Sequence, residues 1–167
     1  MQILETKLLI LRKFTLADAP FILELVNTPT WLEFIGDKGV KNLEDAENYL
    51  KNGSLKSYED NGFGFYLVAE KSTQKPIGMC GFINRQEFEN VDLGFAFLPD
   101  FIGKGFGFEI AQATLHYGKE VLKLGRIIAI VDSRNTASNA LLQKLGFVFE
   151  KTIYFGEKKT LLNLYGI

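Results

Sequence analysis

The sequence predicts one α/β domain, residues 1–167, built on a mixed and mostly antiparallel sheet that helices flank. Three observations lead to this class. A strand pattern at Val91–Leu98 passes through a glycine-rich turn into a long amphipathic helical pattern. That helix is followed by Arg126–Val131, an apolar run typical of a strand covered on both faces. Two more strand patterns, Phe147–Phe155 and Thr160–Tyr165, close the chain as a hairpin.

The other elements follow from apolar periodicity and from capping residues. Asn42 and Asn135 are expected to cap helices that Gly53 and Gly146 end, and Thr15 is expected to cap an earlier helix. A strand, a crossover helix and a second strand form a right-handed parallel pair. The remaining expected strands are Lys7–Arg12, Phe63–Glu70 and Pro76–Asn84, and the expected helical segments are Ala17–Val26, Trp31–Ile35, Leu43–Asn52 and Thr136–Leu145.

Composition excludes several classes of protein. The 19 basic and 20 acidic residues nearly balance, and no run of lysine or arginine offers a surface for nucleic acid. No apolar stretch approaches the length of a membrane span, so no membrane partner is expected. Cys80, the single cysteine, excludes an internal disulfide and fits a cytoplasmic location. With one histidine beside it, a metal site is not expected either.

The glycine-rich turn predicts an anion site. Gly103, Gly105 and Gly107 stand where the turn enters the helix, with Lys104 between the first two. Backbone N–H groups at a helix start have no partner within the helix and carry the positive end of its dipole. Because glycine lets a ligand approach the backbone closely, the turn favours a phosphate or pyrophosphate.

The strand before the turn predicts a ligand path. Asp92, Gly94 and Ala96 occupy every second position and so point to one face of the strand. The side chains in the middle of that face are small, and the face bears one carboxylate. The alternative is that Gly94 and Ala96 only admit a packed helix and Asp92 is a solvated charge at the sheet edge. Farther on, Ser138 and Asn139 fall in the first turn of a helix beside the end of a parallel strand, where ligands of open α/β sheets bind.

These segments together resemble the GNAT superfamily of N-acyltransferases, in particular the branch of ribosomal-protein N-terminal (RimJ/RimL-type) acetyltransferases. The resemblance covers essentially the whole chain, from Glu5-Thr-Lys-Leu-Leu-Ile-Leu-Arg12 to the last strand. The family's pyrophosphate motif falls on Ile102-Gly-Lys-Gly-Phe-Gly107. Gly94-Phe-Ala-Phe-Leu-Pro99, Asn135-x-x-Ser-Asn139 and Lys144-Leu-Gly-Phe147 are also similar to this branch.

The resemblance implies direct transfer of an acetyl group from acetyl-CoA, the cosubstrate, to a primary amine. It also implies a sheet splayed between Val91–Leu98 and Arg126–Val131, where the pantetheine arm enters and leaves the thioester beside Asp92 and Ser138. The residues expected to bind the cofactor are Phe95, Phe97, Leu98, Gly103, Lys104, Gly105, Phe106, Gly107, Phe108, Asn135 and Lys144.

Two departures from the family pattern bear on catalysis. Ile102 replaces a polar or tryptophan residue, so only backbone contacts carry over there. Leu142 stands where many members have a tyrosine that protonates the departing thiolate. The branch is expected to use the serine at Ser138 instead, and a partly exposed Asp92 acting through water is expected to be the base. The alternatives are that Ser138 only caps its helix and that Asp92 only holds a strand edge.

The acceptor groove is expected at Trp31, Glu33 and Phe34, which the resemblance places after the first helix; the alternative is ordinary packing of a short helix. A protein or peptide α-amine, an amino acid, a polyamine and an aminoglycoside all fit. A different class of function is a non-catalytic acyl-CoA-binding sensor on the same scaffold. A nucleotide-binding domain is disfavoured because the chain lacks the Gly-Lys-Ser/Thr of a P-loop. A monomer or a homodimer is expected.

Overall fold

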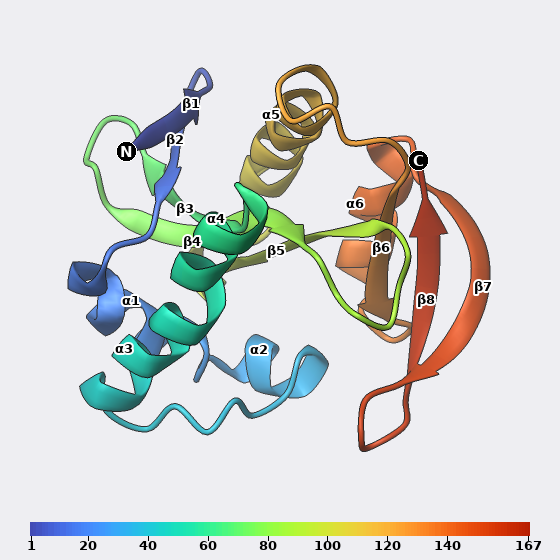
Figure 1. Ribbon diagram of the computed structural model, residues 1–167, viewed down its shortest axis with the longest axis horizontal. Helices are drawn as coiled ribbons and strands as arrows, with labels where there is room; N and C mark the ends of the chain where they lie inside the picture. Colours follow the sequence, from blue (N-terminus) through green and yellow to red (C-terminus); the bar gives the residue numbers. More distant parts are fainter.

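The computed structural model describes residues 1–167 and contains one eight-stranded sheet in the order β1-β2-β3-β4-β5-β6-β8-β7 (Figure 1). The strands are β1 (Gln2–Glu5), β2 (Leu9–Lys13), β3 (Phe65–Glu70), β4 (Pro76–Ile83), β5 (Val91–Phe97), β6 (Ile127–Asp132), β7 (Val148–Phe155) and β8 (Thr160–Gly166). The α-helices are α1 (Ala19–Leu25), α2 (Pro29–Phe34), α3 (Leu43–Leu50), α4 (Lys56–Asn61), α5 (Phe106–Glu120) and α6 (Thr136–Lys144).

The sheet carries a hydrophobic core on each face, because successive strand residues point to opposite sides. In β3, Tyr66 and Val68 belong to the core that α5 covers, whereas Leu67 and Ala69 belong to the core under α1, α2 and α3. Figure 1 shows α5 on one side of the strands and the helices of the first half on the other. The predicted class, a mostly antiparallel sheet flanked by helices, is confirmed.

The parallel pair at the centre of the sheet is short. Only Val91 and Asp92 of β5 pair with β6, opposite Ile127 and Ile128. Beyond that point β6 pairs with β8 alone, and Figure 1 shows β5 and β6 running apart. The remaining residues of β5 therefore have no strand on this side. The expected splay between the two strands is confirmed, and it opens the sheet toward the glycine-rich turn.

Thr15 precedes a 3-10 turn, Leu16–Asp18, and α1 begins only after it, at Ala19. Two larger differences from the sequence-based expectation concern whole elements. A short edge strand, β1, precedes the predicted first strand; its four residues are too few for a clear alternation. The helix predicted to stop at Gly53 instead continues through a π-helical turn, Lys51–Leu55, into α4. It ends at Gly62, whose φ of +77° is the left-handed conformation that closes a helix. Gly53 does not adopt that conformation, so it is no stop.

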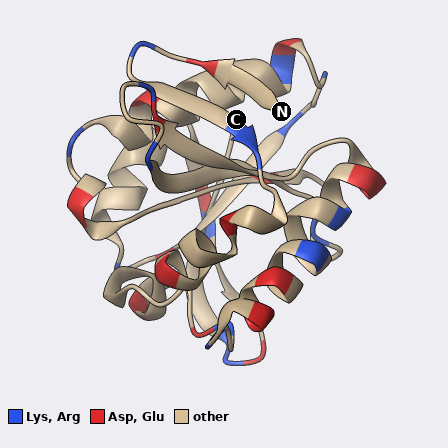
Figure 2. Cartoon of the chain, turned by 90° about the vertical axis from the view of Figure 1, so that its left-hand side faces the viewer, with Lys and Arg blue, Asp and Glu red and all other residues tan.

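Charge is spread over the molecule. In Figure 2 lysine and arginine are interspersed with aspartate and glutamate over the molecule, without a broad field of one sign. None of the helices is long and apolar enough to cross a membrane.

Candidate active site

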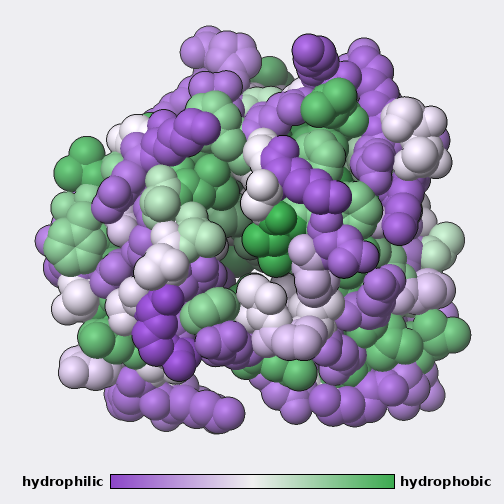
Figure 3. Space-filling view, turned by 180° about the vertical axis from the view of Figure 1, so that it is seen from behind, coloured by the Kyte–Doolittle hydropathy of each residue, from purple (hydrophilic) through white to green (hydrophobic).

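Two cavities adjoin at the splay between β5 and β6, and the surface in Figure 3 is hollowed near its centre. We call the first, of about 570 Å³, the glycine cavity, because Gly103, Gly105 and Gly107 line it. The second, of about 580 Å³, is the Asp92 cavity, after the carboxylate in its wall. Seven residues line both cavities and form what we call the junction: Trp31, Phe34, Ile35, Phe95, Ala96, Asn135 and Ser138.

The glycine cavity contains an open helix start. Gly103 and Gly105 have φ values of +79° and +84°, which side chains of L-residues rarely tolerate. A Cβ at either position would meet no atom within 4 Å, so the backbone there is uncovered. The N–H groups from Gly103 to Phe108 donate to no group of the protein. A row of free donors at the positive end of a 15-residue helix is a site for an anion.

The two cavities also differ in the charged side chains that line them. Arg134 and Lys144 line the glycine cavity, and no aspartate or glutamate does. The Asp92 cavity is lined by four carboxylates and three cationic side chains: Asp37, Asp92, Asp132, Glu157, Lys38, Arg85 and Lys158. The glycine cavity therefore favours a polyanion, and the Asp92 cavity is the better place for an amine.

Ser138 is held at the junction by the start of α6. The Asn135 side chain caps this helix by accepting a hydrogen bond from the Ser138 backbone N–H, at 3.1 Å. Asn139 anchors the same turn: it donates to the Asp132 carbonyl and accepts from Tyr165 of β8, at 3.0 and 2.7 Å. The Ser138 hydroxyl itself has no hydrogen-bond partner in the protein. The alternative that Ser138 only caps its helix is therefore wrong, since Asn135 is the cap.

Asp92 differs from the expectation of a partly exposed carboxylate. It is 2% exposed, and its Oδ2 accepts a hydrogen bond from Arg85 Nε at 2.8 Å. Its Oδ1 has no partner. Burial raises the pKa of Asp92 to about 6, although the charge of Arg85 acts in the opposite direction. The reading of Asp92 as a solvated edge charge is equally wrong, because β4 and β6 flank it.

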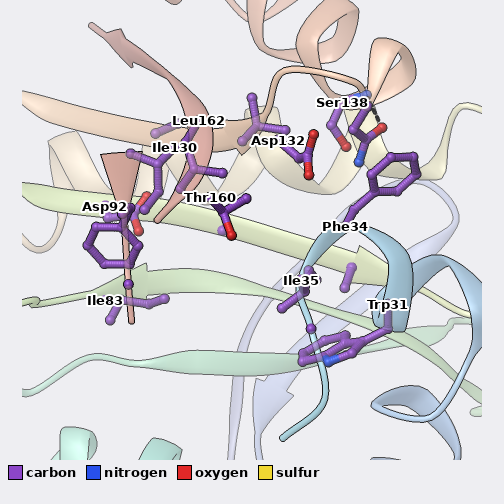
Figure 4. Close-up of a pocket in the computed structure, with 18 of the residues that line it drawn as sticks. Trp31, Phe34, Ile35, Ile83, Asp92, Ile130, Asp132, Ser138, Thr160 and Leu162 are labelled. Atoms are coloured by element: carbon purple, nitrogen blue, oxygen red, sulfur yellow. Dashed lines mark hydrogen bonds between the residues drawn. The ribbon is translucent and has the colours of Figure 1, made fainter. Parts of the chain in front are cut away.

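Asp92 and Ser138 also lie apart. Asp92 is opposite Ile128, whereas the turn that leads to Ser138 begins after Asp132, four residues along β6. At about 3.3 Å per residue, this displacement along the strand is about 13 Å. Figure 4 shows Asp92 at one end of the cavity and Ser138, with Asp132 beside it, at the other. A single thioester cannot be adjacent to both.

Most of the predicted binding residues line the cavities. Trp31, Phe34, Phe95 and Asn135 are at the junction, and the other predicted residues in the wall of the glycine cavity are Phe97, Gly103, Gly105, Gly107, Phe108 and Lys144. The Lys144 ammonium lies 4.2 Å from the centre of the Phe108 ring. These residues of the sequence motif therefore lie together in the wall of one cavity, and its role in binding an anion stays a prediction.

Four predicted side chains do not line either cavity. Leu98 is buried in the core beneath α1, and its N–H is taken by the Ile77 carbonyl at 2.8 Å. Lys104 and Phe106 both turn toward Phe101: the Lys104 ammonium is 5.6 Å, and the Phe106 ring 6.2 Å, from the centre of its ring. Glu33 offers only its carbonyl, to Arg134. For Lys104 and Phe106 the expected contact is made by the backbone at the helix start, so the direction of their side chains does not bear on it.

The space predicted beside Gly94 is partly filled. A Cβ on Gly94 would lie 2.8 Å from the ring of Phe65, a β3 residue that lines the Asp92 cavity. The glycine thus admits an aromatic ring rather than the packed helix that was the alternative. Ala96, the next small residue on this face, remains at the junction.

Arg134 is a residue that sequence reasoning missed. Its guanidinium pairs with the buried carboxylate of Asp132 at 2.8 Å and donates to the Glu33 carbonyl at 3.2 Å. It also lies 5.8 Å from the centre of the Phe34 ring. The hydrogen bond from Arg134 lowers the pKa of Asp132, which keeps the pair charged. The only local signal was a charged pair between a strand end and a helix cap.

Comparison with known proteins gives a consistent result. The family model described as an acetyltransferase (GNAT) domain matches residues 9–148. The uncharacterized N-acetyltransferase YoaA of Bacillus subtilis (strain 168) is 31% identical over 146 residues, which are 87% of this chain and 82% of that protein.

Solved structures show the same fold. The ribosomal-protein-S5-alanine acetyltransferase of Vibrio fischeri superposes with a TM-score of 0.81 at 21% identity, over 100% of this chain and 96% of that one. The ribosomal L7/L12 α-N-protein acetyltransferase RimL, solved in complex with coenzyme A, gives 0.76 at 17% identity, over 100% and 97%. At these identities the likeness is one of fold.

Proposed function

The chain belongs to the GNAT family of acyl-CoA-dependent acetyltransferases, and we propose that it moves an acetyl group from acetyl-CoA to a primary α-amine at the junction of its two cavities. The observation that supports this most is the position of Ser138, which lines both cavities and whose hydroxyl is free. One domain, residues 1–167, would carry the whole activity.

The cofactor is assigned to the glycine cavity. Its diphosphate would accept hydrogen bonds from the free N–H groups that begin at Gly103, and Lys144 and Arg134 would balance further negative charge. The pantetheine arm would follow the unpaired edge of β5 past Phe95 and Ala96, because β6 has turned away there. This path ends at the junction, so the thioester would lie beside Ser138.

The amine would enter through the Asp92 cavity and attack the thioester carbonyl carbon with its lone pair. The carbon–sulfur bond then breaks, and the electron pair leaves on sulfur. We assign the proton that the thiolate takes up to the Ser138 hydroxyl, which regains it from solvent, while the new amide releases its extra proton to water. The reaction needs no other group to be oxidised or reduced.

The pKa of the attacking amine favours an α-amine. With an ordinary pKa of about 7.7–8.0, an α-amine is roughly a tenth neutral at pH 7, whereas a lysine amine near 10.4 is below about 0.1%. A neutral fraction of that size needs no strong base. This fits the position of Asp92, which is paired with Arg85 and displaced from Ser138 along β6. We therefore do not retain the base role for it.

The proposal is tested by following coenzyme A release and acceptor mass together. Peptides with a free N-terminus and an internal lysine are compared with the same peptides blocked at the N-terminus. We expect one acetyl group on the free peptides, at the α-amine, and none on the blocked ones. Acetylation of the blocked peptides would show a lysine acceptor. Tight acetyl-CoA binding with transfer to no amine would instead support the acyl-CoA sensor.

A further inference from the structure

Two buried polar side-chain atoms without hydrogen-bond partners belong to residues that line the Asp92 cavity. Only three buried side-chain nitrogen or oxygen atoms lack a partner in the protein: Trp31 Nε1, Tyr66 Oη and Asp92 Oδ1. Tyr66 belongs to the core beneath α5 and lines neither main cavity, whereas Trp31 and Asp92 both line the Asp92 cavity. Because buried polar groups are hydrogen-bonded as a rule, two exceptions in one cavity indicate a ligand that supplies their partners.

The two unpaired atoms have opposite chemistry and different positions. The indole N–H of Trp31 can only donate a hydrogen bond, and it belongs to the junction, where the reacting amine is placed. The carboxylate of Asp92 can only accept one when ionised. Asp92 pairs with Ile128, four residues along β6 from Asp132 and the turn that leads to Ser138, a displacement of about 13 Å. Figure 4 shows the two residues on different walls of the cavity.

Arg85 completes the far end of the cavity. Only its Nε is engaged, by Asp92 Oδ2, and its two Nη groups donate to no group of the protein. Its guanidinium lies over the Phe155 ring at 5.5 Å, which holds it beside Asp92. This end therefore offers one free acceptor, Asp92 Oδ1, next to free donors on Arg85. A peptide group, with its N–H and its C=O, has the complementary pair.

We propose that the acceptor is an extended peptide whose first carbonyl accepts from Trp31 and whose backbone near the fourth residue is bound by Asp92 and Arg85. The inference rests on the proposed function and adds the length and polarity of the substrate. At about 3.3–3.6 Å per extended residue, about four residues span the distance from the junction to Asp92. Asp92, Arg85 and Trp31 are then specificity-determining residues.

Other amines match this pattern less well. A polyamine carries donors alone, so it would leave both the Trp31 N–H and the free donors of Arg85 without partners. A single amino acid ends near the junction and does not reach Asp92. The cavity therefore selects by length as well as by charge.

The test compares kcat/KM for alanine peptide amides of one to five residues, all with free N-termini. In the wild type we expect kcat/KM to rise about tenfold or more between two and four residues, because a charge-assisted hydrogen bond is gained. Asp92→Ala should flatten that rise, so that its kcat/KM for the four-residue amide falls to about its own value for the two-residue amide. Arg85→Gln, which keeps a side chain over Phe155, should flatten the rise of kcat/KM with peptide length in the same way. Trp31→Phe should lower kcat/KM at every length, alanine amide included, because the first carbonyl is present in all of these acceptors.

Asp60→Asn is the matched control, since it removes an exposed carboxylate that pairs with Lys56 on α4. It should leave the length profile unchanged. A flat profile in the wild type, a profile that persists in folded Asp92→Ala and Arg85→Gln, or spermidine as the better acceptor would overturn the inference. Transfer to alanine amide in any of these cases would still support the proposed function, so the two failures can be told apart.

Discussion

At the scale of single residues, Ser138 and Asp92 differ in how many of their hydrogen-bonding atoms the fold leaves free. Ser138 gives only its backbone N–H to the helix cap, so its hydroxyl is available at the junction. Asp92 is buried, with one oxygen bound to Arg85. The free hydroxyl is suited to moving a proton, whereas the paired carboxylate is suited to holding a ligand.

The change Ser138→Ala tests the first of these roles. We expect kcat to fall by about 10²-fold, within the range for loss of a general acid, with the acetyl-CoA dissociation constant nearly unchanged. Because Asn135 still caps α6, the melting temperature should stay close to that of the wild type. Steady-state kinetics and calorimetry measure all three quantities. Ser133→Ala, in the same turn but outside both cavities, is the control; equal kcat in the two variants would remove the acid assignment.

At the scale of the element, the start of α5 is suited to an anion because two glycines, Gly103 and Gly105, hold the chain in the left-handed region. That conformation points successive N–H groups into the glycine cavity. Gly107 serves helix packing instead, since a Cβ there would lie 3.1 Å from the Leu141 side chain, and its absence lets α5 approach α6. Substitutions at the three glycines therefore test different properties.

Gly105→Asn tests the anion site with little backbone strain, because asparagine tolerates positive φ better than most residues. Its side chain would occupy the open space in front of the N–H groups. We expect acetyl-CoA to bind about tenfold or more weakly in titration calorimetry, since phosphate contacts are lost. Gly62→Asn makes the same change at a φ of +77°, away from both cavities, and should not alter binding. Unchanged affinity in folded Gly105→Asn would contradict the site.

At the scale of the whole molecule, the sheet has two parts that separate where β5 leaves β6. The helix α2 packs in the core of the first part, and the turn from β6 to α6 belongs to the second. Arg134 joins them across the cleft, through Asp132 on one side and the Glu33 carbonyl on the other. The wall of the proposed acceptor site is thereby tied to the turn that leads to Ser138.

Arg134→Lys keeps the positive charge but loses the planar fork that reaches both partners. We expect the acceptor KM to rise several-fold while the KM for acetyl-CoA changes little, since the charge beside the cofactor remains. The Arg134 side chain is exposed, and lysine can still pair with the buried carboxylate of Asp132, so the melting temperature should move only slightly. Arg126→Lys, at a similar pair with Glu150 within the second part of the sheet, is the control. An acceptor KM equal in both variants would show that Arg134 does not position α2.

Much of the fold could be predicted because its signals are local. Periodicity and capping residues within short segments predict several elements. These are the strand, glycine turn and helix around Gly105, the helix that Asn135 caps, and the closing hairpin. The same motifs indicated the family and predicted that Ser138 lies in the first turn of a helix. Local signals failed where the chain is too short for a pattern, as at β1, or where backbone conformation overrides composition, as at Gly53.

The environment of the site was decided by tertiary structure. Nothing near Asp92 indicated that Arg85 would pair with it, or that β4 and β6 would bury it. The contact between Arg134 and Glu33 joins residues 101 positions apart, and the ring that fills the space at Gly94 comes from β3. By itself the sequence determined the fold class, the order of most elements and the position of the glycine-rich turn at the start of α5. Burial, pairing and side-chain direction came from packing, because they depend on segments that meet only when the chain has folded.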